Sequence, residues 1–465
     1  MTEFYRIPDD YEKRSAEFRV VCDGTVLDVN RCDVSAFPLN KVSQPQRSFD
    51  QTEPSSFIRL GSDGEVTLQI TPKKAFDEVT VRPLSKNITP QINGGTVTVT
   101  FPCAGQYSVE FDGVHHVLAV FVNPIKDFGV KPDDENTLYF GAGVHYLPKV
   151  TELSDGATVY IDKDAVVYGG FAAIEKKNIR ILGYGILDNT TVLRGQGGPL
   201  FFSHCENVQV EGVTVVNSAG WSIHFAGCKD VIVRNIKLIG MWRYNSDGCD
   251  FTNCTNAAIY DSFLRNFDDC IVVKGMIGNY TMPVQHIHAE NCVLWCDWGR
   301  ALELGAETCA PVFTDVSFEN CDIIHGDAVM LDIQHGDSAD FSDIRFNNIR
   351  IEYMSKVNAP VLQTEPDQIY VNPNENHMPA LFVVNTIHTM WSKQDRTGNI
   401  ENVSFKDIFV TTDGRIPPSN INAYAKDTTI RGVHFENIVI NGKKCLTLDE
   451  LNIQPGENVS DVTVK

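Results

Sequence analysis

The chain has 465 residues, of which 43% are hydrophobic and 21% are charged, so it can bury a large core and is not disordered. A single core rarely exceeds about 250–300 residues, so two domains are expected. The formal net charge of -21 argues against nucleic acid or an anionic membrane as a partner, because both require clustered Lys and Arg side chains.

The N-terminus and the cysteines bear on location. Residues 1–14 are polar and charged, without the apolar segment of a signal peptide, and no stretch approaches the roughly 20 apolar residues of a membrane helix. The 13 cysteines are scattered without C-x-x-C pairs, which favours free buried thiols. We therefore expect a cytoplasmic protein, or a secreted one if a signal peptide has been removed. The sequence does not indicate an oligomeric state.

Residues 1–125 are expected to form an all-β domain. Short segments alternate apolar and polar residues and are separated by Gly, Pro and Asp-Gly turn signals. The expected strands are 17–22, 26–32, 56–60, 66–71, 78–83, 96–101, 106–111 and 116–122. Short strands at this spacing predict a small antiparallel β-sandwich, which we interpret as a support or binding module.

Residues 126–465 carry an internal repeat. Its nine-residue pattern begins with a residue that is usually Asn or Asp and has Asn, Asp or Gly at its sixth place. The second, fourth, seventh and ninth places are usually apolar. The pattern starts at Asn178, Asn207, Asp230, Asn256, His286, Asp315, Asp343, Asn402 and Gly432. The steps are 23–30 residues long except for one of 59, which predicts either a degenerate coil or an insertion at 354–399. Less regular units are expected at 137–147 and 158–169.

This period indicates a solenoid. The Leu-rich frame of leucine-rich repeats is absent, and helical repeats need a 3.6-residue periodicity, whereas these segments alternate with period 2. Strand repeats with Asn at the bends are typical of a parallel β-helix, in which each turn adds a rung at about 4.8 Å. The sequence therefore predicts an all-β protein with a parallel β-helix at 126–465 after the β-sandwich at 1–125.

Three carboxylates fall at equivalent places in two consecutive repeats. The coils align on the apolar pairs Ile223/Phe225, Cys249/Phe251, Ile271/Val273 and Leu302/Leu304. Two residues before these pairs stand Trp221, Asp247, Asp269 and Arg300, with Asp268 beside Asp269 in sequence. Another column holds His224, Asp250, Val272 and Glu303. Because a bare carboxylate in the core is costly, we expect Asp247 and Asp269 to lie at a bend before each strand and to face a surface groove.

Clustered carboxylates suggest acid–base chemistry. Like charges on adjacent rungs repel each other and raise one pKa, which points to a functional use. Inversion at a glycosidic bond needs one protonated and one ionised carboxyl group about 6.5–9.5 Å apart, and neighbouring rungs can provide this. Binding of Ca²⁺ through the oxygen atoms is the alternative for the three aspartates.

Two motifs carry a family resemblance. The segment Asn-Ser-Asp-Gly-Cys-Asp at 245–250 resembles the Asn-Thr-Asp-Gly-x-Asp motif of polygalacturonase-type enzymes, glycoside hydrolase family 28. The segment Asp-Asp-Cys-Ile at 268–271 resembles that family's Asp-Asp-Cys-[Ile/Val] motif. The resemblance covers roughly residues 137–465. It implies a right-handed parallel β-helix and inverting hydrolysis of α-linked galacturonides in an oligo- or polysaccharide, with no cofactor and no metal.

The resemblance also implies roles for single residues. Asp268 would be the general acid, and Asp247 and Asp269 would activate water. Asn245 and Asp250 would orient the water or a sugar hydroxyl.

The sequence departs from the family pattern at two places. Arg300 stands where the family has the His of Gly-His-Gly, and no basic residue lies near 330–332, where the family has an Arg-Ile-Lys that binds the substrate carboxylate. Arg300 could bind that carboxylate by a bidentate contact, or the glycan could be a different one. A β-sandwich before such a β-helix is also similar to dextranase-type enzymes of family 49, so α-glucans are the alternative substrates.

Further residues are candidates for substrate binding. Trp242 and Trp298 are predicted to stack on sugar rings, since they lie in bends near the acids, and Trp221 and Trp295 lie close by. Lys274, Glu303 and His224 could line the cleft. The His-Gly-Asp segments at 325–327 and 335–337 lie one or two rungs further on and could contact substrate. A polysaccharide lyase or epimerase and a non-catalytic glycan-binding solenoid are the rival functions.

Overall fold

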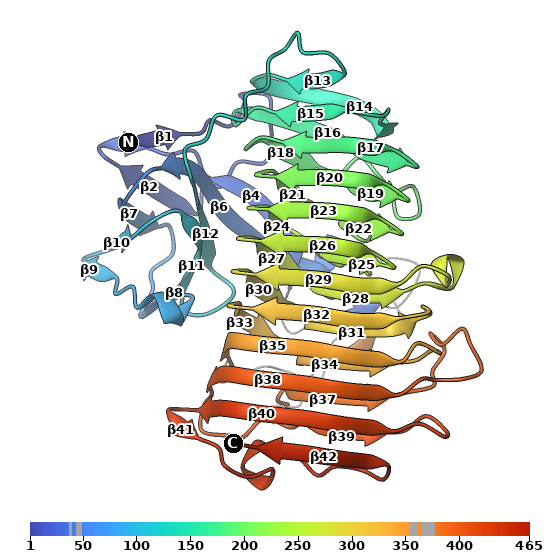
Figure 1. The fold of residues 1–465 in the computed structure, drawn as a ribbon. Coiled ribbons are helices and arrows are strands. Elements are labelled where there is room, and N and C mark those ends of the chain that lie inside the picture. Colours follow the sequence, from blue (N-terminus) through green and yellow to red (C-terminus); the bar gives the residue numbers. More distant parts are fainter. Residues whose placement is uncertain (37–39, 43–48, 354–360, 364–376) are drawn as a thin grey trace.

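The structure is a computed structural model that describes residues 1–36, 40–42, 49–353, 361–363 and 377–465 (Figure 1). In this part of the chain the strands form four sheets. Short 3-10 helices lie at η1 (Phe49–Gln51), η2 (Leu84–Lys86), η3 (Ile277–Asn279) and η4 (Asp449–Leu451). Among the same residues, no helix has the length and hydrophobicity needed to cross a membrane.

Two sheets form the N-terminal β-sandwich, as predicted. The first contains β1 (Thr2–Phe4), β4 (Asn30–Ser35), β6 (Thr52–Ser62), β8 (Val79–Arg82), β11 (Gly105–Phe111) and β12 (Val117–Asn123). The second contains β2 (Phe18–Cys22), β3 (Thr25–Val26), β7 (Val66–Pro72), β9 (Gln91–Asn93) and β10 (Thr96–Phe101). Side chains such as Leu68, Val99 and Val120 are buried between the sheets.

Two details of the predicted sandwich are wrong. The single strand expected at 26–32 is divided, because the chain passes there from the second sheet (β3) to the first (β4). The sandwich is also not purely antiparallel, since β6 and β12 pair in parallel. The chain between them crosses to the second sheet and back, which allows a parallel pair where a hairpin would not.

The rest of the chain forms a right-handed parallel β-helix with three faces, and this confirms the predicted fold. Face I contains β13 (Thr137–Phe140), β15 (Thr158–Ile161), β17 (Lys177–Leu182), β20 (Glu206–Glu211), β23 (Lys229–Arg234), β26 (Thr255–Tyr260), β29 (Val284–Glu290), β32 (Phe313–Glu319), β35 (Phe341–Glu352), β38 (Ile400–Thr411), β40 (Ile430–Ile440) and β42 (Val459–Val464), with β41 (Lys443–Lys444) beside β40. Face II contains β14 (Gly143–Glu152), β16 (Ala165–Ile174), β18 (Ile186–Asp188), β21 (Thr214–Val216), β24 (Lys237–Ile239), β27 (Phe263–Asn266), β30 (Val293–Cys296) and β33 (Asp322–Gly326). Face III contains β19 (Leu200–Ser203), β22 (Ile223–Ala226), β25 (Cys249–Thr252), β28 (Ile271–Gly275), β31 (Arg300–Thr308), β34 (Val329–His335), β37 (Ala380–Thr386) and β39 (Asn420–Ala423).

The repeat pattern marks residues in the left-handed backbone conformation. All nine starting residues have positive φ, between +52° at Asp315 and +71° at Gly432. The sixth residue of each repeat, at the corner between faces I and II, also has positive φ. Asn, Asp and Gly adopt this conformation at the lowest cost, so the corners of the β-helix are visible in the sequence.

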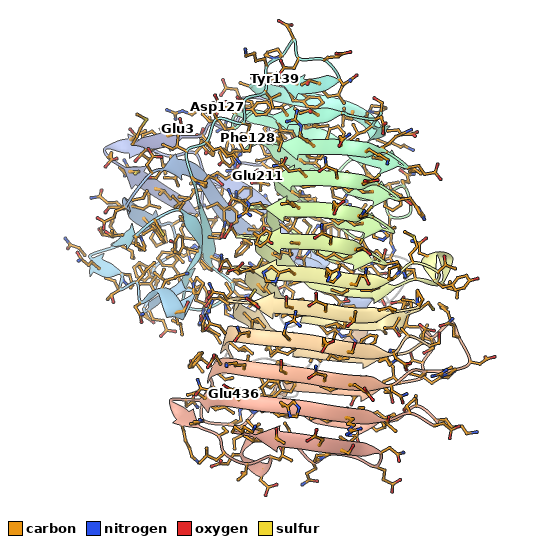
Figure 2. The ribbon with its side chains drawn as sticks, in the orientation of Figure 1. Glu3, Asp127, Phe128, Tyr139, Glu211 and Glu436 are labelled. Atoms are coloured by element: carbon orange, nitrogen blue, oxygen red, sulfur yellow. The ribbon has the colours of Figure 1, made fainter. Side chains whose placement is uncertain are left out.

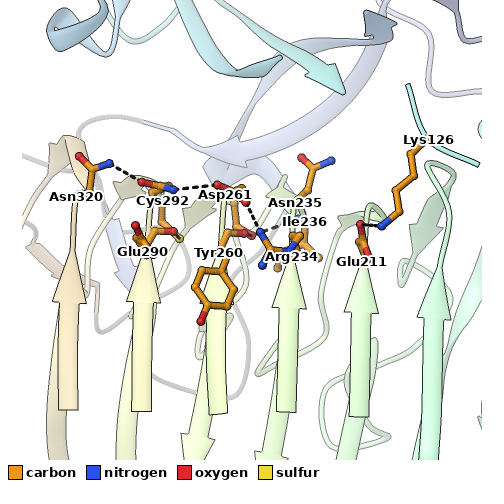
Figure 3. Close-up of polar contacts among 12 residues, drawn as sticks. Lys126, Glu211, Arg234, Asn235, Ile236, Tyr260, Asp261, Glu290, Cys292 and Asn320 are labelled. Atoms are coloured by element: carbon orange, nitrogen blue, oxygen red, sulfur yellow. Dashed lines mark hydrogen bonds and ion pairs between the residues drawn. The ribbon is translucent and has the colours of Figure 1, made fainter. Parts of the chain in front are cut away.

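The corner side chains bind one another from rung to rung. Arg234 donates to Asp261 at 2.7 Å, and Asn291 donates to the other oxygen of Asp261 at 3.1 Å (Figure 3). Asn348 donates to Asn320 at 3.0 Å. This ladder of polar side chains provides hydrogen-bond partners at the corners and links each rung to the next.

The repeat step of 59 residues contains an insertion and no additional coil. Strand β38 pairs directly with β35, and β37 pairs with β34. Because β37 is a rung of the β-helix, the insertion expected at 354–399 was too long. Its residues 354–360 and 364–376 lie outside the described part of the chain. Strand β36 (Val361–Gln363), between these two ranges, pairs with β5 (Asn40–Val42) of the N-terminal segment.

The sandwich packs against face II of the β-helix, from β16 to β33 (Figure 1). Apolar residues from both parts form one cluster, in which the rings of Phe121 and Phe263 lie 5.1 Å apart. A buried polar contact joins the same surfaces, with His325 and Glu110 at 2.8 Å. The segment after β12, which carries Phe128 (Figure 2), continues this contact, because the ring of Phe128 lies 5.1 Å from that of Tyr184.

This packing excludes two of the further candidates for contact with substrate. Trp295 is 1% exposed and His325 is 2% exposed, and their rings lie 4.1 Å apart under the sandwich. Arg265 covers the ring of Trp295 at 3.7 Å. The expectation that Trp295 and His325 contact a sugar is therefore wrong, because both side chains belong to the interface between the two parts.

The corner ladder gives a test of stability. Asn320 has φ +51° and accepts hydrogen bonds from Asn348 at 3.0 Å and Arg350 at 2.6 Å. Asn320→Ala should lower the free energy of unfolding by about 3–4 kcal/mol, since a left-handed Ala costs about 1–2 kcal/mol and each of these two lost hydrogen bonds about 1 kcal/mol. Asn320→Gly should cost less, because Gly keeps the conformation. Urea unfolding of both variants measures the difference, and equal stabilities would contradict the role of the backbone conformation.

Candidate active site

The expected register of face III is present. Ile223, Cys249, Ile271 and Leu302 pair in succession across β22, β25, β28 and β31. Just before these strands, three backbone amides donate to the carbonyl groups of the next rung, namely Ser222 to Asp247 at 2.9 Å, Gly248 to Asp269 at 2.7 Å, and Cys270 to Arg300 at 2.8 Å. Asp247, Asp269 and Arg300 therefore lie on successive rungs, as predicted.

The two aspartates precede their strands, because β25 begins at Cys249 and β28 at Ile271. This is the bend position that the sequence predicts, between faces II and III. Gly248 and Gly299 bring the rungs together there. A Cβ atom on Gly248 would lie 2.2 Å from the carbonyl oxygen of Cys270, and one on Gly299 would lie 2.6 Å from Asp269 Oδ1. Any larger residue at either glycine would push apart the chains that carry the carboxylates.

The trio is more deeply enclosed than the expected groove implies. The exposed fractions are 1% for Asp247, 6% for Asp268 and 5% for Asp269. Low exposure strengthens electrostatic interactions and disfavours the charged form of each carboxyl group. The local charges therefore decide which of these groups holds a proton.

Lys274 forms ion pairs with two carboxyl groups of the cluster. Its Nζ lies 3.3 Å from Asp247 Oδ2, 3.6 Å from Asp250 Oδ1, and 4.3 Å from the centre of the Trp221 ring. Burial raises the pKa of Asp250 to about 8, although Lys274 acts in the opposite direction. Burial also raises the pKa of Asp247 well above its usual value, again opposed by Lys274. Both of these predicted residues are thus inside the cluster and depend on Lys274.

Asp268 is suited to carry a proton near neutral pH. Burial is the main cause that raises its pKa to about 7, and the charge of the adjacent Asp269 adds to it. Arg300 and Lys274 only partly oppose this shift. A buried carboxylic acid with a pKa near the working pH is what general acid catalysis requires.

Asp269 is held in the opposite state. Burial acts to raise its pKa, but Arg300, Lys274 and a hydrogen bond with Glu303 together bring the pKa below its usual value. The guanidinium of Arg300 lies 3.5 Å from Asp269 Oδ1, and the backbone amide of Arg300 donates to the same oxygen at 2.9 Å. Asp268 and Asp269 are neighbours in sequence, and their environments separate their protonation states.

Arg300 is enclosed by acids. Its Nε lies 3.4 Å from Asp332 Oδ2 and 3.9 Å from Glu303 Oε1. Gln334 donates to Asp332 at 2.7 Å and to Glu303 at 3.3 Å. Burial raises the pKa of Glu303 well above its usual value and that of Asp332 to about 6. Asp332 and Gln334 were missed in the sequence, although the pairing of Asp332 with Glu303 continues the predicted column by one rung.

An aromatic wall lies beside Asp268. The rings of Tyr244 and Trp298 stack at 5.5 Å, and the charge of Asp268 is, after burial, the next cause that raises the pKa of Tyr244. Arg194 donates to the carbonyl group of Tyr244 at 2.6 Å and to the side-chain oxygen of Asn245. Tyr244 and Arg194 were not selected from the sequence. Tyr244 directly precedes the predicted motif, and this position could have indicated a role in the site. Arg194 lies in a loop about 50 residues earlier, and nothing in its local sequence connects it to the motif.

Trp242 lies under the N-terminal segment. It is 6% exposed, with Phe49 at 5.8 Å from its ring and the guanidinium of Arg243 at 5.4 Å. Trp298 is partly exposed beside Tyr244. The predicted pair of tryptophans is therefore divided, with Trp298 beside the carboxylates and Trp242 covered.

His224 lies on the other side of the cluster. Its Nε2 is 3.0 Å from Thr252 Oγ1, and its ring is 4.7 Å from that of Trp221. Burial lowers the pKa of His224 to about 3, and the charge of Lys274 adds to this effect, so the imidazole is neutral. His224 and Trp221 line a cavity of about 370 Å³ together with Phe201.

The segment at 335–337 contacts the end of β31 at Thr308 and the loop that contains Gln394. His335 is fully buried and contacts Thr308 Oγ1 at 2.9 Å. Asp337 is also fully buried and accepts from the backbone amides of Thr308 and Gln394, each at 2.9 Å. The expectation that these residues contact substrate is therefore wrong.

The sequence and the fold were compared with known proteins. The sequence model of glycosyl hydrolases family 28 matches residues 196–454. A probable endopolygalacturonase D from Neosartorya fischeri is 25% identical over 203 residues, which are 43% of this chain and 36% of that protein. The chain thus spans about a third of the length of this relative (36%).

Two solved structures resemble the whole chain or most of it. Dex49A from Penicillium minioluteum has a TM-score of 0.64 at 15% identity, with 100% of this chain and 96% of that chain covered, which shows a shared fold. The family 28 exopolygalacturonase of Yersinia enterocolitica has a TM-score of 0.47 at 14% identity, with 87% and 97% covered. The family match extends over more than half of the chain and includes Asp247, Asp268 and Asp269. The chain therefore belongs to glycosyl hydrolases family 28.

Proposed function

We propose that the protein hydrolyses α-glycosidic bonds in an oligo- or polysaccharide, with inversion at the anomeric carbon and with Asp268 as the general acid. The contrast between two neighbouring carboxyl groups carries this proposal. The pKa of Asp268 is raised to about 7, mainly by burial, whereas Arg300 and Lys274 bring that of Asp269 below its usual value despite burial. One group can donate a proton while the other accepts one.

In this mechanism, Asp268 transfers its proton to the glycosidic oxygen as the bond from that oxygen to the anomeric carbon breaks. Asp269 removes a proton from a water molecule, which attacks the anomeric carbon from the opposite face. Asp247 lies one rung from Asp269 and assists by holding the water. Burial raises the pKa of Asp247, and the charge of Lys274 opposes this rise. Asn245 and Asp250 orient the water or a sugar hydroxyl.

The rival functions fit these residues less well. A lyase or epimerase needs a base that removes a proton from carbon, but Lys274 and Arg300 are engaged in ion pairs. His224 is a weak base, because burial lowers its pKa to about 3. A non-catalytic solenoid does not require two adjacent carboxyl groups in opposite states. Family membership makes α-linked galacturonides the first substrates to test, and α-glucans the second.

Replacement of the acid tests the reaction. Asp268→Asn should reduce kcat by about 10²–10⁴-fold, the usual contribution of a general acid, and should leave binding intact. Reducing-sugar release from oligogalacturonides, rhamnogalacturonides and isomalto-oligosaccharides measures the effect. Asp230→Asn is a matched control, because Asp230 is a corner residue with φ +57° and other repeats have Asn at its place. Full activity of Asp268→Asn would eliminate Asp268 as the acid, and unsaturated products would indicate a lyase.

The stereochemistry of the first product tests inversion. An α-linked substrate should release the β-anomer of the new reducing end, because water attacks opposite to the leaving group. Proton NMR during the first minutes, before mutarotation, distinguishes the two anomers. An initial α-anomer would show retention, which needs a carboxylate nucleophile and contradicts the roles given to Asp247 and Asp269.

The pH dependence of kcat/KM tests the two protonation states. Activity should fall as the pH rises through about 7, where Asp268 loses its proton, and should fall on the acid side only below the usual carboxyl range, where Asp269 gains one. Arg300→Gln should move both limbs to higher pH, since the guanidinium lowers both pKa values. Arg300→Lys should restore part of the shift. A lower rate with unchanged limbs would mean that Arg300 has only a structural role.

A further inference from the structure

A cavity of about 370 Å³ lies beside the carboxylate cluster. This volume is at the lower end of the range of about 300–1,000 Å³ that is typical of ligand sites. Trp221, Phe201 and His224 form an aromatic part of its wall, in which the His224 ring lies 5.2 Å from that of Phe201 and 4.7 Å from that of Trp221. The residues that line the cavity, all within the described chain, include no Asp, Glu, Lys or Arg.

Trp221 connects this cavity to the acids. The centre of its ring is 4.3 Å from Lys274 Nζ, which in turn is 3.3 Å from Asp247 Oδ2. Trp221 and Lys274 therefore lie between a sugar ring in the cavity and Asp247. Aromatic faces bind the apolar faces of sugar rings, and the neutral imidazole of His224 offers a polar contact.

The site itself has an excess of acid. Six carboxyl groups interact with one another and with two cations, and these groups belong to Asp247, Asp250, Asp268, Asp269, Glu303 and Asp332. Lys274 is paired with Asp247 and Asp250. Arg300 is paired with three more, Asp269, Glu303 and Asp332. Neither cation is available to a substrate carboxylate without the loss of these contacts.

Several buried oxygen atoms of the acids also have no hydrogen-bond partner in the described chain. These atoms are Asp247 Oδ1, both carboxylate oxygens of Asp250, Glu303 Oε2 and Asp332 Oδ1. Such atoms are costly to leave unmatched. Because burial raises the pKa of Asp247, Asp250 and Glu303, these groups hold protons and need partners that both donate and accept. The hydroxyl groups of a neutral sugar do both, whereas an ionised carboxylate can only accept.

We propose that this site selects an uncharged sugar, which the cavity of Trp221, Phe201 and His224 binds beside the acids. The inference rests on the proposed hydrolytic function and names its substrate class. Neutral α-glucans, α-galactans and methyl-esterified galacturonides fit, and free galacturonate does not. An ionised sugar carboxylate would enter this enclosed site without a free cation, and the loss of its hydration should weaken binding by roughly 10–100-fold. The net charge of -21 adds repulsion at longer range.

Arg194 is the cation that could oppose this selection. It donates to the uncharged carbonyl group of Tyr244 and to the side chain of Asn245, and its guanidinium lies 4.9 Å from the centre of the Tyr244 ring. An anionic sugar that does bind should therefore contact Arg194. Arg194→Gln should then weaken the binding of the anionic sugar more than that of a neutral sugar.

A pair of matched substrates separates charge from sugar identity. The probes are α-1,4-linked oligogalacturonides before and after complete methyl esterification, which differ in charge and keep the same ring and linkage. We expect kcat/KM to be roughly 10–100-fold higher for the ester. Salt should raise kcat/KM for the free acid and leave that for the ester unchanged, because salt screens only charged partners. Equal or faster cleavage of the free acid would overturn the proposal.

Two variants test the named groups. Asp332→Asn keeps the shape of the side chain and removes a charge, so it should reduce the preference for the ester several-fold, while Asp230→Asn should not change it. Trp221→Ala should raise KM for the ester more than it lowers kcat, and Trp221→Phe should restore KM. An unchanged preference in Asp332→Asn, or an unchanged KM in Trp221→Ala, would contradict the assignment.

A binding measurement distinguishes failure of this inference from failure of the proposed function. The Asp268→Asn variant is titrated with both oligosaccharides, and the fluorescence of Trp221 and Trp298 beside the site reports binding. If no substrate is hydrolysed but the ester binds and the free acid does not, the hydrolytic function fails and the selection of an uncharged sugar stands. Binding of the free acid as tight as that of the ester, or binding of neither, overturns the selection.

Discussion

Hydrogen bonds between the backbones of successive rungs determine every distance in the site. The carbonyl groups of Asp247, Asp269 and Arg300 each accept from the amide of the rung before, so their side chains are separated by one rung and leave the chain at the same bend. Gly248 and Gly299 permit this spacing, because no Cβ atom fits between the chains. The chemistry therefore depends on backbone pairing, and the side chains add charge to positions that are already fixed.

Burial makes the pKa of each carboxyl group depend strongly on its position in the site. In water, neighbouring carboxyl groups would all ionise in the usual acidic range, but in this enclosed site each pKa depends on the nearest cation. Arg300 and Lys274 lower the pKa of Asp269, and the same cations leave that of Asp268 raised to about 7. Two adjacent residues of one type thus differ in protonation, because one of them contacts the guanidinium, and the proposed mechanism uses this difference.

The sequence predicts the β-helix well because its corners need left-handed residues and its strands need alternation, and both are local properties. The column of His224, Asp250 and Glu303 could be aligned for the same reason. Arg194 and the covering of Trp242 by Phe49 could not be predicted, since these contacts join segments that are distant in the chain. Trp295 was misjudged because alternation identifies two faces of a strand but does not say which face a second domain will cover.

The position of the sandwich has a mechanical consequence. It packs on face II from β16 to β33, and the bends after β24, β27 and β30 carry Trp242 to Gly248, Asp268 and Asp269, and the residues just before Arg300. The sandwich thus supports the coils that carry the carboxylates. Small displacements of these coils would alter the geometry proposed for proton transfer. Changes at its contacts, such as those of Phe121 or Glu110, can therefore be transmitted to the turnover rate across the thickness of the β-helix. The two parts of the chain share one apolar interface, and a β-helix without its sandwich would present an uncovered apolar face.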